Sequence, residues 1–181
     1  NPGLRSRAPG GVILALSFAL FAYLVKGVSL AQVLANIWIS VFAAALSVIS
    51  PWGHTLRIAS LAALAEAASD TASSELGQAF GKRARLITNG RAVPIGTDGG
   101  ISLVGVFAGL LAALLVALES HWTGQAEMHA AGVIVVSGFL GMIFDSFLGA
   151  LLERKGWLTN NGVNLASTCF SALLAILLTC I

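Results

Sequence analysis

Six long apolar stretches constrain this chain of 181 residues more than any other feature. A helix needs about 20 residues to cross the roughly 30 Å hydrocarbon core of a bilayer. The six windows cover residues 11–30, 33–49, 55–77, 101–118, 130–152 and 164–181. Only 10% of the residues are charged, whereas soluble domains carry about 25%. The sequence therefore predicts an all-α, polytopic bundle of about six transmembrane helices, with residues 1–181 as one integral membrane domain.

The distribution of basic residues predicts how this bundle is oriented. The polar stretch 78–100 carries four Lys or Arg residues and the turn at 154–155 carries two, whereas residues 119–129 contain none. Basic residues in short loops mark the cytoplasmic side, so the first two segments are expected inside and the third outside. The net charge of +2 is scattered along the chain, which argues against a nucleic-acid partner. The first residue is Asn1 rather than Met, so the N-terminal part is expected to be incomplete or processed.

Acidic residues inside the apolar windows are the strongest functional signal. An ionised Asp near the middle of a membrane helix costs about 2.5–3.5 kcal/mol, so such residues usually face water, a cation or a partner charge. Helical spacing puts Glu66, Asp70 and Ser74 on one stripe, and Thr71 with Glu75 on the next. These groups offer oxygen ligands, which suit Mg²⁺. The alternative is a packing face whose hydroxyls bond across the bundle.

A second pair of an acid and a hydroxyl, Asp145–Ser146, lies in the fifth window. Gly141 and Gly149 stand at helical spacing from it and permit close helix approach. Because the third and fifth windows are expected to run in the same direction, Asp70, Glu75 and Asp145 should reach a similar depth. The pattern predicts a polar site at the cytoplasmic surface of the membrane.

Residues 93–100 form a loop rich in Pro and Gly that leads into the fourth window. Gly96, Gly99 and Gly100 permit close backbone approach, and the helix N-terminus beyond them offers unpaired N–H groups to phosphate. The loop matches neither of the common glycine motifs for phosphate. The alternative is a simple turn in which Thr97 or Asp98 caps the following helix.

Two further polar groups keep two interpretations each. The cations of the stretch 78–100 are suited to clamping a phosphorylated substrate, yet the orientation rule alone requires cations there. Asn160, Asn161 and Asn164 read as a polar cap at the start of the last helix or as ligand contacts.

Six sequence blocks stand in a fixed order: QVLAN at 32–36, SDT with SELG at 69–77, RLIT at 85–88, VP with GTDGGIS at 93–102, DS with GA at 145–150, and NN with VN at 160–164. In these blocks the chain resembles an integral-membrane family long catalogued as a domain of unknown function. Plant phytyl-phosphate kinase of tocopherol synthesis and transmembrane protein 19 belong to that family. Ala72 departs from its pattern, because a Trp commonly follows the Asp-Thr pair.

The resemblance implies transfer of a phosphoryl group to an isoprenoid monophosphate such as phytyl phosphate. The expected donor is a nucleoside triphosphate, CTP in the first place, with Mg²⁺ as cofactor. The host is expected to be a bacterial inner membrane or a thylakoid or plastid membrane, with the site facing the cytoplasm or stroma. Formation of a homo-oligomer is left open.

Three groups of residues are assigned to this reaction, since phosphoryl transfer needs positioning and charge neutralisation above all. The catalytic and metal-binding carboxylates are Asp70, Glu75, Asp98 and Asp145. The residues expected at the nucleotide are Thr71, Ser74, Gly96, Thr97, Gly99, Gly100, Ser146 and Asn161. The residues expected at substrate phosphates are Lys82, Arg85, Thr88 and Asn164.

Two other functions are compatible with the same residues. In a small transporter or ion pathway, Glu66, Asp70 and Asp145 would line a route through the bundle. Such a pathway should spread polar residues through the full thickness, yet windows four and six have few in their middles. A cytidylyltransferase-like lipid enzyme would use the same nucleotide and release pyrophosphate.

Overall fold

The structure, a computed structural model, describes residues 30–181. Within this range the long helices are α3 (Leu30–Ile49), α4 (Gly53–Phe80), α5 (Leu103–Trp122), α6 (Met128–Leu151) and α7 (Asn160–Thr179). Between them lie the strands β1 (Ala84–Leu86), β2 (Ala92–Val93) and β3 (Gly100–Ile101), and the short 3-10 helix η1 (Glu153–Lys155). The first apolar window, 11–30, lies outside the described residues except for its last position.

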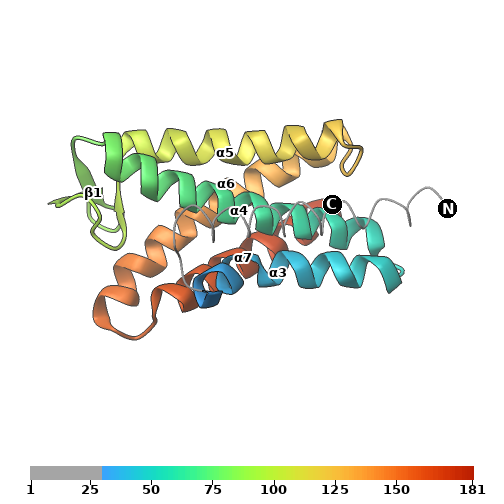
Figure 1. Cartoon of the computed structure of the whole chain (residues 1–181), viewed down its shortest axis with the longest axis horizontal. Helices are drawn as coiled ribbons and strands as arrows, with labels where there is room; N and C mark the ends of the chain where they lie inside the picture. The colour runs from blue at the N-terminus through green and yellow to red at the C-terminus, as the bar shows by residue number, and fades with distance from the viewer. Residues whose placement is uncertain (1–29) are drawn as a thin grey trace.

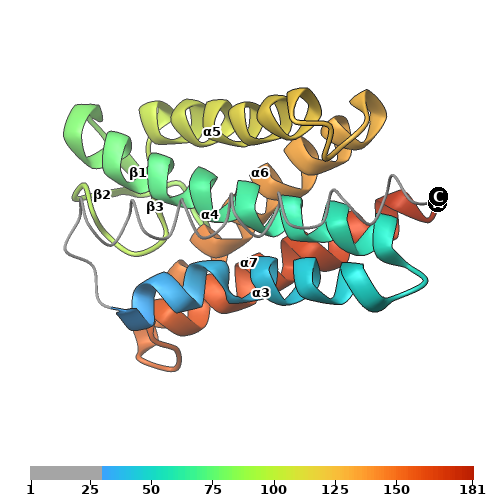
Figure 2. The same ribbon diagram turned by 45° about the vertical axis from the view of Figure 1, so that its right-hand side comes forward.

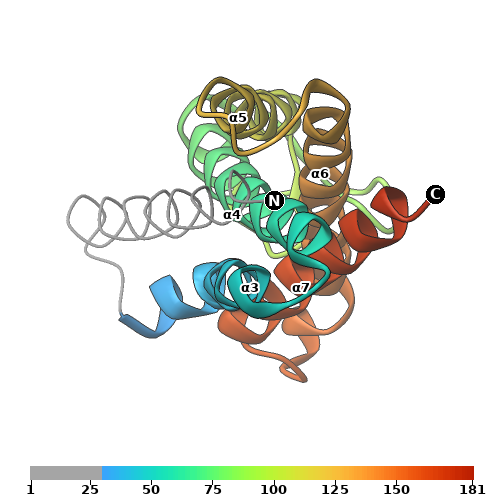
Figure 3. The ribbon, with the colours of Figure 1, turned by 90° about the vertical axis from the view of Figure 1, so that its right-hand side faces the viewer.

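Helix α4 is the centre of the bundle. It contacts α3, α5, α6 and α7, and the view along the bundle shows the other four helices arranged around it (Figure 3). All residues from Arg57 to Ser69 are buried. A helix wrapped in this way by protein does not need an apolar surface toward lipid, which explains how α4 holds Glu66 and Asp70 within a membrane protein.

The outer helices carry the apolar surface. In α5 the side chains of Leu103, Phe107, Leu111 and Leu115 are all more than half exposed, as expected of residues that face lipid. Within the described range, α3, α5, α6 and α7 are each long and apolar enough to cross a membrane. The prediction of an all-α, polytopic membrane bundle is confirmed, although the count of six helices is not.

Small residues allow the helices to approach α4 closely. A Cβ on Gly105 of α5 would lie 2.7 Å from the Ser73 backbone oxygen, and a Cβ on Gly138 of α6 would lie 2.7 Å from the Ala65 Cβ. The Ser69 hydroxyl donates a hydrogen bond of 2.5 Å to the Gly109 carbonyl. The packing alternative for the hydroxyls of α4 therefore holds for Ser69.

The polar stretch between α4 and α5 folds as a small antiparallel sheet with strand order β2-β1-β3. Arg85 pairs with Ala92 on one side and with Ile101 on the other. The sequence did not predict these strands, because two or three residues are too short to show an alternating pattern. Since β3 takes Gly100 and Ile101, α5 begins at Leu103 rather than at 101.

The sheet and η1 lie at one end of the bundle, and the α3–α4 and α5–α6 connections lie with the C-terminus at the other (Figures 1 and 2). The two basic segments, 78–100 and 154–155, are thus at the same end, as the charge distribution predicts.

Candidate functional site

A pocket of about 310 Å³ opens at the sheet end of the bundle. Its walls come from the first two turns of α3, the C-terminal half of α4, the loop before β3, the end of α6 and the start of α7. Helical segments that are far apart in sequence therefore meet here, together with the glycine-rich loop. The pocket lies at the end of the bundle that carries both basic segments, 78–100 and 154–155, and its position at the cytoplasmic surface stays a prediction.

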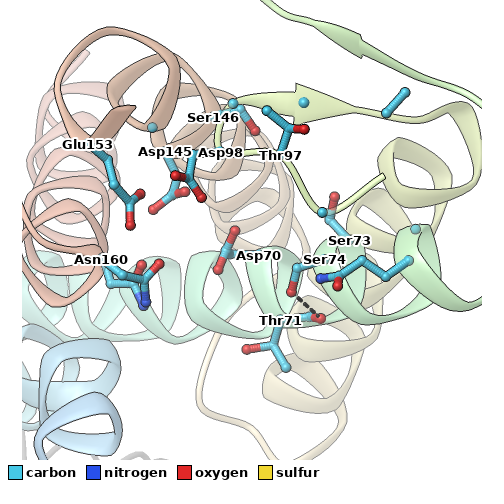
Figure 4. A pocket seen from close by; sticks show the side chains of 18 of the residues that line it. Asp70, Thr71, Ser73, Ser74, Thr97, Asp98, Asp145, Ser146, Glu153 and Asn160 are labelled. Carbon is cyan, nitrogen blue, oxygen red and sulfur yellow. Dashed lines mark hydrogen bonds between the residues drawn. The ribbon is translucent and has the colours of Figure 1, made fainter. Parts of the chain in front are cut away.

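Four carboxylates from four different segments line this pocket. Asp70 comes from α4, Asp98 from the loop, Asp145 from α6 and Glu153 from η1, and Figure 4 shows their side chains directed toward a common space. Asp70 is within electrostatic range of both Asp145 and Glu153, and Asp98 is within range of Glu153. Neighbouring like charges disfavour ionisation of all four groups at once unless a cation or a proton offsets their charge.

The side chain of Asp145 is held from α7. The Ser167 hydroxyl donates a hydrogen bond to Asp145 Oδ2 at 3.1 Å. One turn away, the Asn164 side-chain amide donates to Asn36 Oδ1 at 2.8 Å, which ties α7 to α3 across the pocket. Because both amides line the pocket, they offer neutral donors and acceptors beside the acids.

The glycine-rich loop is seated on α6. Gly99 has φ +71°, and a Cβ there would collide with Ala150. A Cβ on Gly149 would lie 3.0 Å from the Gly99 nitrogen. Only glycine meets both the left-handed backbone and the close approach, so this contact fixes Asp98 above the end of α6.

The residue that caps α5 is not one of the two that the sequence suggested. Ser102 caps α5, and its side chain accepts a hydrogen bond from the Gly105 N–H at 3.0 Å. The Thr97 hydroxyl instead donates to the Pro94 carbonyl at 2.7 Å. The expectation that Thr97 or Asp98 caps this helix is therefore wrong. At the start of α7 the cap is Thr159, which precedes the three asparagines.

Most of the predicted site residues line the pocket. They are Asp70, Thr71, Ser74, Gly96, Thr97, Asp98, Gly99, Gly100, Asp145, Ser146 and Asn164. The other five, which are Glu75, Lys82, Arg85, Thr88 and Asn161, are not among its lining residues.

The positions of those five residues have plain structural reasons. Glu75 is exposed and lies five residues after Asp70, which turns it about 140° around the helix. Arg85 directs its guanidinium to the Gly90 carbonyl at 2.8 Å on the exposed hairpin. Lys82 and Thr88 are exposed as well, and Asn160 takes the place in the pocket that was expected for Asn161.

Sequence reasoning did not assign several lining residues to the site. They are Gln32, Asn36, Ser73, Gln78, Ser102 and Glu153, whereas Asn160 was one of the three asparagines named as possible ligand contacts. Glu153 follows Asp145 by eight residues, about two helical turns, and this spacing was a usable signal. Its neighbours Arg154 and Lys155 made the segment read as a basic turn.

The donor set is compatible with Mg²⁺. Within residues 30–181 no group of three or more His, Cys, Asp or Glu side chains is arranged to hold a metal ion. Mg²⁺ in nucleotide enzymes is usually bound by one or two carboxylates, with water and substrate phosphates completing the octahedron. A pocket with several carboxylates and open space fits that mode.

Comparison with known proteins places the chain in a family. Residues 12–172 match the model of the family described as Integral membrane protein DUF92. The "Uncharacterized membrane protein MJ0933" of Methanocaldococcus jannaschii is 37% identical over 93% of this chain and 76% of its own length. The "Uncharacterized membrane protein sll0875" of Synechocystis is 34% identical over 78% of this chain and 57% of its own length.

A plant protein is similar as well. "Protein VTE6, chloroplastic" of Arabidopsis thaliana is 35% identical over 70% of this chain, which spans 39% of that protein. No solved structure matches the chain. The chain belongs to the DUF92 family of integral membrane proteins.

Proposed function

We propose that this protein is an isoprenoid-phosphate kinase that transfers a phosphoryl group from a nucleoside triphosphate to a prenyl monophosphate. The observation that carries the proposal is the charge of the pocket. Four carboxylates line it, and the described residues of its lining include no Lys, Arg or His. A polyphosphate would be repelled by such a surface unless divalent cations came between. The similarity to VTE6 and the resemblance to phytyl-phosphate kinase supply the acceptor class.

The reaction asks little covalent chemistry of the protein. An oxygen of the acceptor monophosphate forms a bond to the γ-phosphorus, and the bond from that phosphorus to the β–γ bridging oxygen breaks. The electron pair leaves with the nucleoside diphosphate. Because the acceptor oxygen is already ionised, no general base is needed. Catalysis then depends on alignment and on neutralising the charge of the phosphates.

Different residues of the pocket are proposed to bind the cation and to orient the phosphates. Asp70 and Asp145 are proposed to hold Mg²⁺, which would neutralise charge on the phosphates when bound. Asp98 and Glu153 line the same pocket beside Asp145 (Figure 4) and are proposed to bind a second cation or the waters around the first. Backbone N–H groups of the loop 96–100 and the amides of Asn36 and Asn164 are proposed to orient phosphate oxygens.

The predicted contacts of Lys82, Arg85 and Thr88 with substrate phosphates stay predictions, as does the choice of CTP. A pocket at one end of a membrane bundle suits a lipid-like acceptor, whose phosphate is proposed to lie in the pocket while its chain stays among the helices. We also propose that the sheet end faces the cytoplasm or stroma, since both basic segments lie there.

The test is a product analysis with purified protein in detergent. Mg²⁺, each nucleoside triphosphate in turn and a panel of prenyl monophosphates are incubated with the protein, and products are resolved by mass. The proposal expects a prenyl diphosphate together with a nucleoside diphosphate. Pyrophosphate with a nucleotidyl lipid would identify a cytidylyltransferase instead. Ion or solute flux in liposomes without nucleotide turnover would identify a transporter.

A further inference from the structure

Large apolar side chains are rare in the wall of the pocket, and two of them stand together on α3. Among the described residues that line the pocket, the apolar side chains larger than alanine are Val33, Ile37 and Ile95. Ile95 belongs to the loop before β3 and is 39% exposed, whereas Val33 and Ile37 lie one turn apart on α3 and are 7% and 5% exposed. These two residues, the α3 wall, give the acidic pocket a buried apolar side that the transfer of a phosphoryl group does not itself require.

Two polar contacts on the adjacent stripe fix the rotation of α3. Asn36 Oδ1 accepts a hydrogen bond from the Asn164 side-chain amide of α7 at 2.8 Å. One turn further along, the Ser60 hydroxyl of α4 donates to the Ser40 carbonyl at 2.8 Å. Asn36 and Ser40 each follow one residue of the α3 wall by three positions, so the two stripes are neighbours on the helix. These hydrogen bonds therefore hold the α3 wall at the pocket.

The apolar stripe of α3 continues beyond the pocket. Val41 packs against the α3 wall and lies eight residues, about 12 Å, along the helix from Val33. Helix α3 begins near the sheet end and runs to the opposite end of the bundle (Figures 1 and 2), and its span Ala31–Ile49 is long and apolar enough to cross a membrane. The stripe thus leads away from the polar end of the bundle, which suits a lipid chain better than a nucleobase.

The volume of the pocket limits which part of a lipid chain the α3 wall contacts. At about 310 Å³ the pocket is at the small end of ligand pockets, which span roughly 300–1,000 Å³. It does not enclose the phosphates of two substrates and a whole polyprenyl chain. Only the carbons next to the acceptor phosphate therefore share the pocket with the carboxylates.

We propose that Val33 and Ile37 are specificity-determining residues that contact the first isoprene unit of the acceptor, next to its phosphate. Their role deepens the proposed function, and rests on it in taking a prenyl monophosphate as the acceptor. A hydrophobic contact of this kind discriminates through the carbons that it buries, and a single methylene group in such a contact changes selectivity by roughly 10–200-fold.

The first test measures how strongly the purified protein in detergent prefers one of two water-soluble monophosphates. Dimethylallyl monophosphate carries one isoprene unit and methyl phosphate carries none, and both are titrated by calorimetry in the presence of Mg²⁺. Val33→Thr and Ile37→Thr place a hydroxyl on the α3 wall, which must lose water when the isoprene unit binds. Each variant is expected to lower the preference for dimethylallyl monophosphate about 10-fold and to leave the binding of methyl phosphate unchanged.

Val41→Thr is the matched control. Val41 belongs to the same stripe but is not among the lining residues of the pocket. It receives the same hydroxyl in place of a methyl group, so its preference should equal that of the wild type. Thermal unfolding in detergent is measured in parallel for all three variants.

A second test uses the wild-type protein and does not depend on the folding of any variant. Geranylgeranyl monophosphate with a diazirine on its first isoprene unit is photolysed on the protein, and the labelled residues are identified by mass spectrometry. The label is expected on α3 at or beside Val33 and Ile37, and excess dimethylallyl monophosphate should prevent it.

Five results would overturn this assignment. They are wild-type preference in both Val33→Thr and Ile37→Thr, an equal loss in Val41→Thr, label only on segments other than α3, a wild-type protein that does not distinguish the two monophosphates, and variants that lose affinity for nucleoside triphosphates instead. The last result would assign the α3 wall to the base.

The same measurements separate this assignment from the kinase activity. Preference and label that depend on the α3 wall, in a protein without phosphoryl transfer, would keep the assignment and reject the kinase. Transfer to prenyl monophosphates with the label elsewhere would keep the kinase and reject the assignment. A wild-type protein that binds no prenyl monophosphate would reject both.

Discussion

Single residues in this protein were predictable where their placement is energetically costly. Asp70 and Asp145 stood out because an acid within a membrane helix needs a compensating environment, and both line the pocket. Glu75 satisfied the same criterion, but a helical stripe does not fix which side of a helix faces inward. Asn36 gave no such signal because an amide near a helix start is common, and its role depends on Asn164 from the far end of the chain.

Gly99 provides a residue-scale prediction about the pocket. Its φ of +71° and its contact with Ala150 mean that Gly99→Ala should move the loop that carries Asp98 off α6. A displacement of about 1 Å at a reacting group can cost on the order of 100-fold in rate. We expect phosphoryl transfer by Gly99→Ala to fall 10–100-fold, about the size such displacements produce, in a steady-state assay.

The matched control is Gly90→Ala in the exposed hairpin. Gly90 has a similar φ of +68°, but a Cβ there meets nothing within 4 Å. This substitution carries only the backbone strain, about 1–2 kcal/mol, and leaves the pocket alone. Equal activity in the two variants would show that the seat of the loop on α6 is not needed.

At the scale of the element, the helices could be predicted from the thickness of the bilayer, whereas the strands were too short to predict. Within residues 30–181 the predicted and observed helices agree within a few residues, because membrane thickness sets their length. The exception is α4, whose 28 residues extend about 42 Å, more than the roughly 30 Å of the hydrocarbon core. Its burial by four neighbours could not be read from its own sequence, which is less apolar than theirs.

The close approach of α6 to α4 gives an element-scale prediction. Gly138→Ala puts a methyl group 2.7 Å from the Ala65 Cβ, and such overpacking typically costs 1–3 kcal/mol. Gly132→Ala in the same helix meets nothing within 4 Å and should be neutral or slightly stabilising. Thermal unfolding in detergent should therefore separate the two variants. A Gly138→Ala protein as stable as Gly132→Ala would mean that the two helices are not packed this closely.

At the scale of the whole molecule, charge predicted which loops share an end, and the fold places both basic segments beside the pocket. The charge pattern could not predict which helices are neighbours. The structure shows that α3 and α7 meet at the pocket through the hydrogen bond between Asn36 and Asn164. The pocket is formed by α3, α4, α6 and α7 together with η1 and the loop before β3, and its lining could not be derived from any one segment.

Sidedness gives a prediction at this scale. In a background with Cys169 and Cys180 replaced by Ala, Gly90→Cys marks the sheet end and His129→Cys marks the opposite end. A membrane-impermeant maleimide should label Gly90→Cys in inside-out bacterial vesicles and His129→Cys in spheroplasts. The reverse pattern would place the pocket outside the cytoplasm, where nucleoside triphosphates are not supplied.

The central claim is that carboxylates from separate helices hold the nucleotide through a divalent cation. The most direct measurement is Mg²⁺-dependent transfer from a nucleoside triphosphate to a prenyl monophosphate by Asp70→Asn and Asp145→Asn, with Glu119→Gln at the other end of the bundle as control. We predict that both Asp variants fold and insert like the wild type but lose transfer, while Glu119→Gln keeps it. Near-normal transfer in either Asp variant would contradict the account.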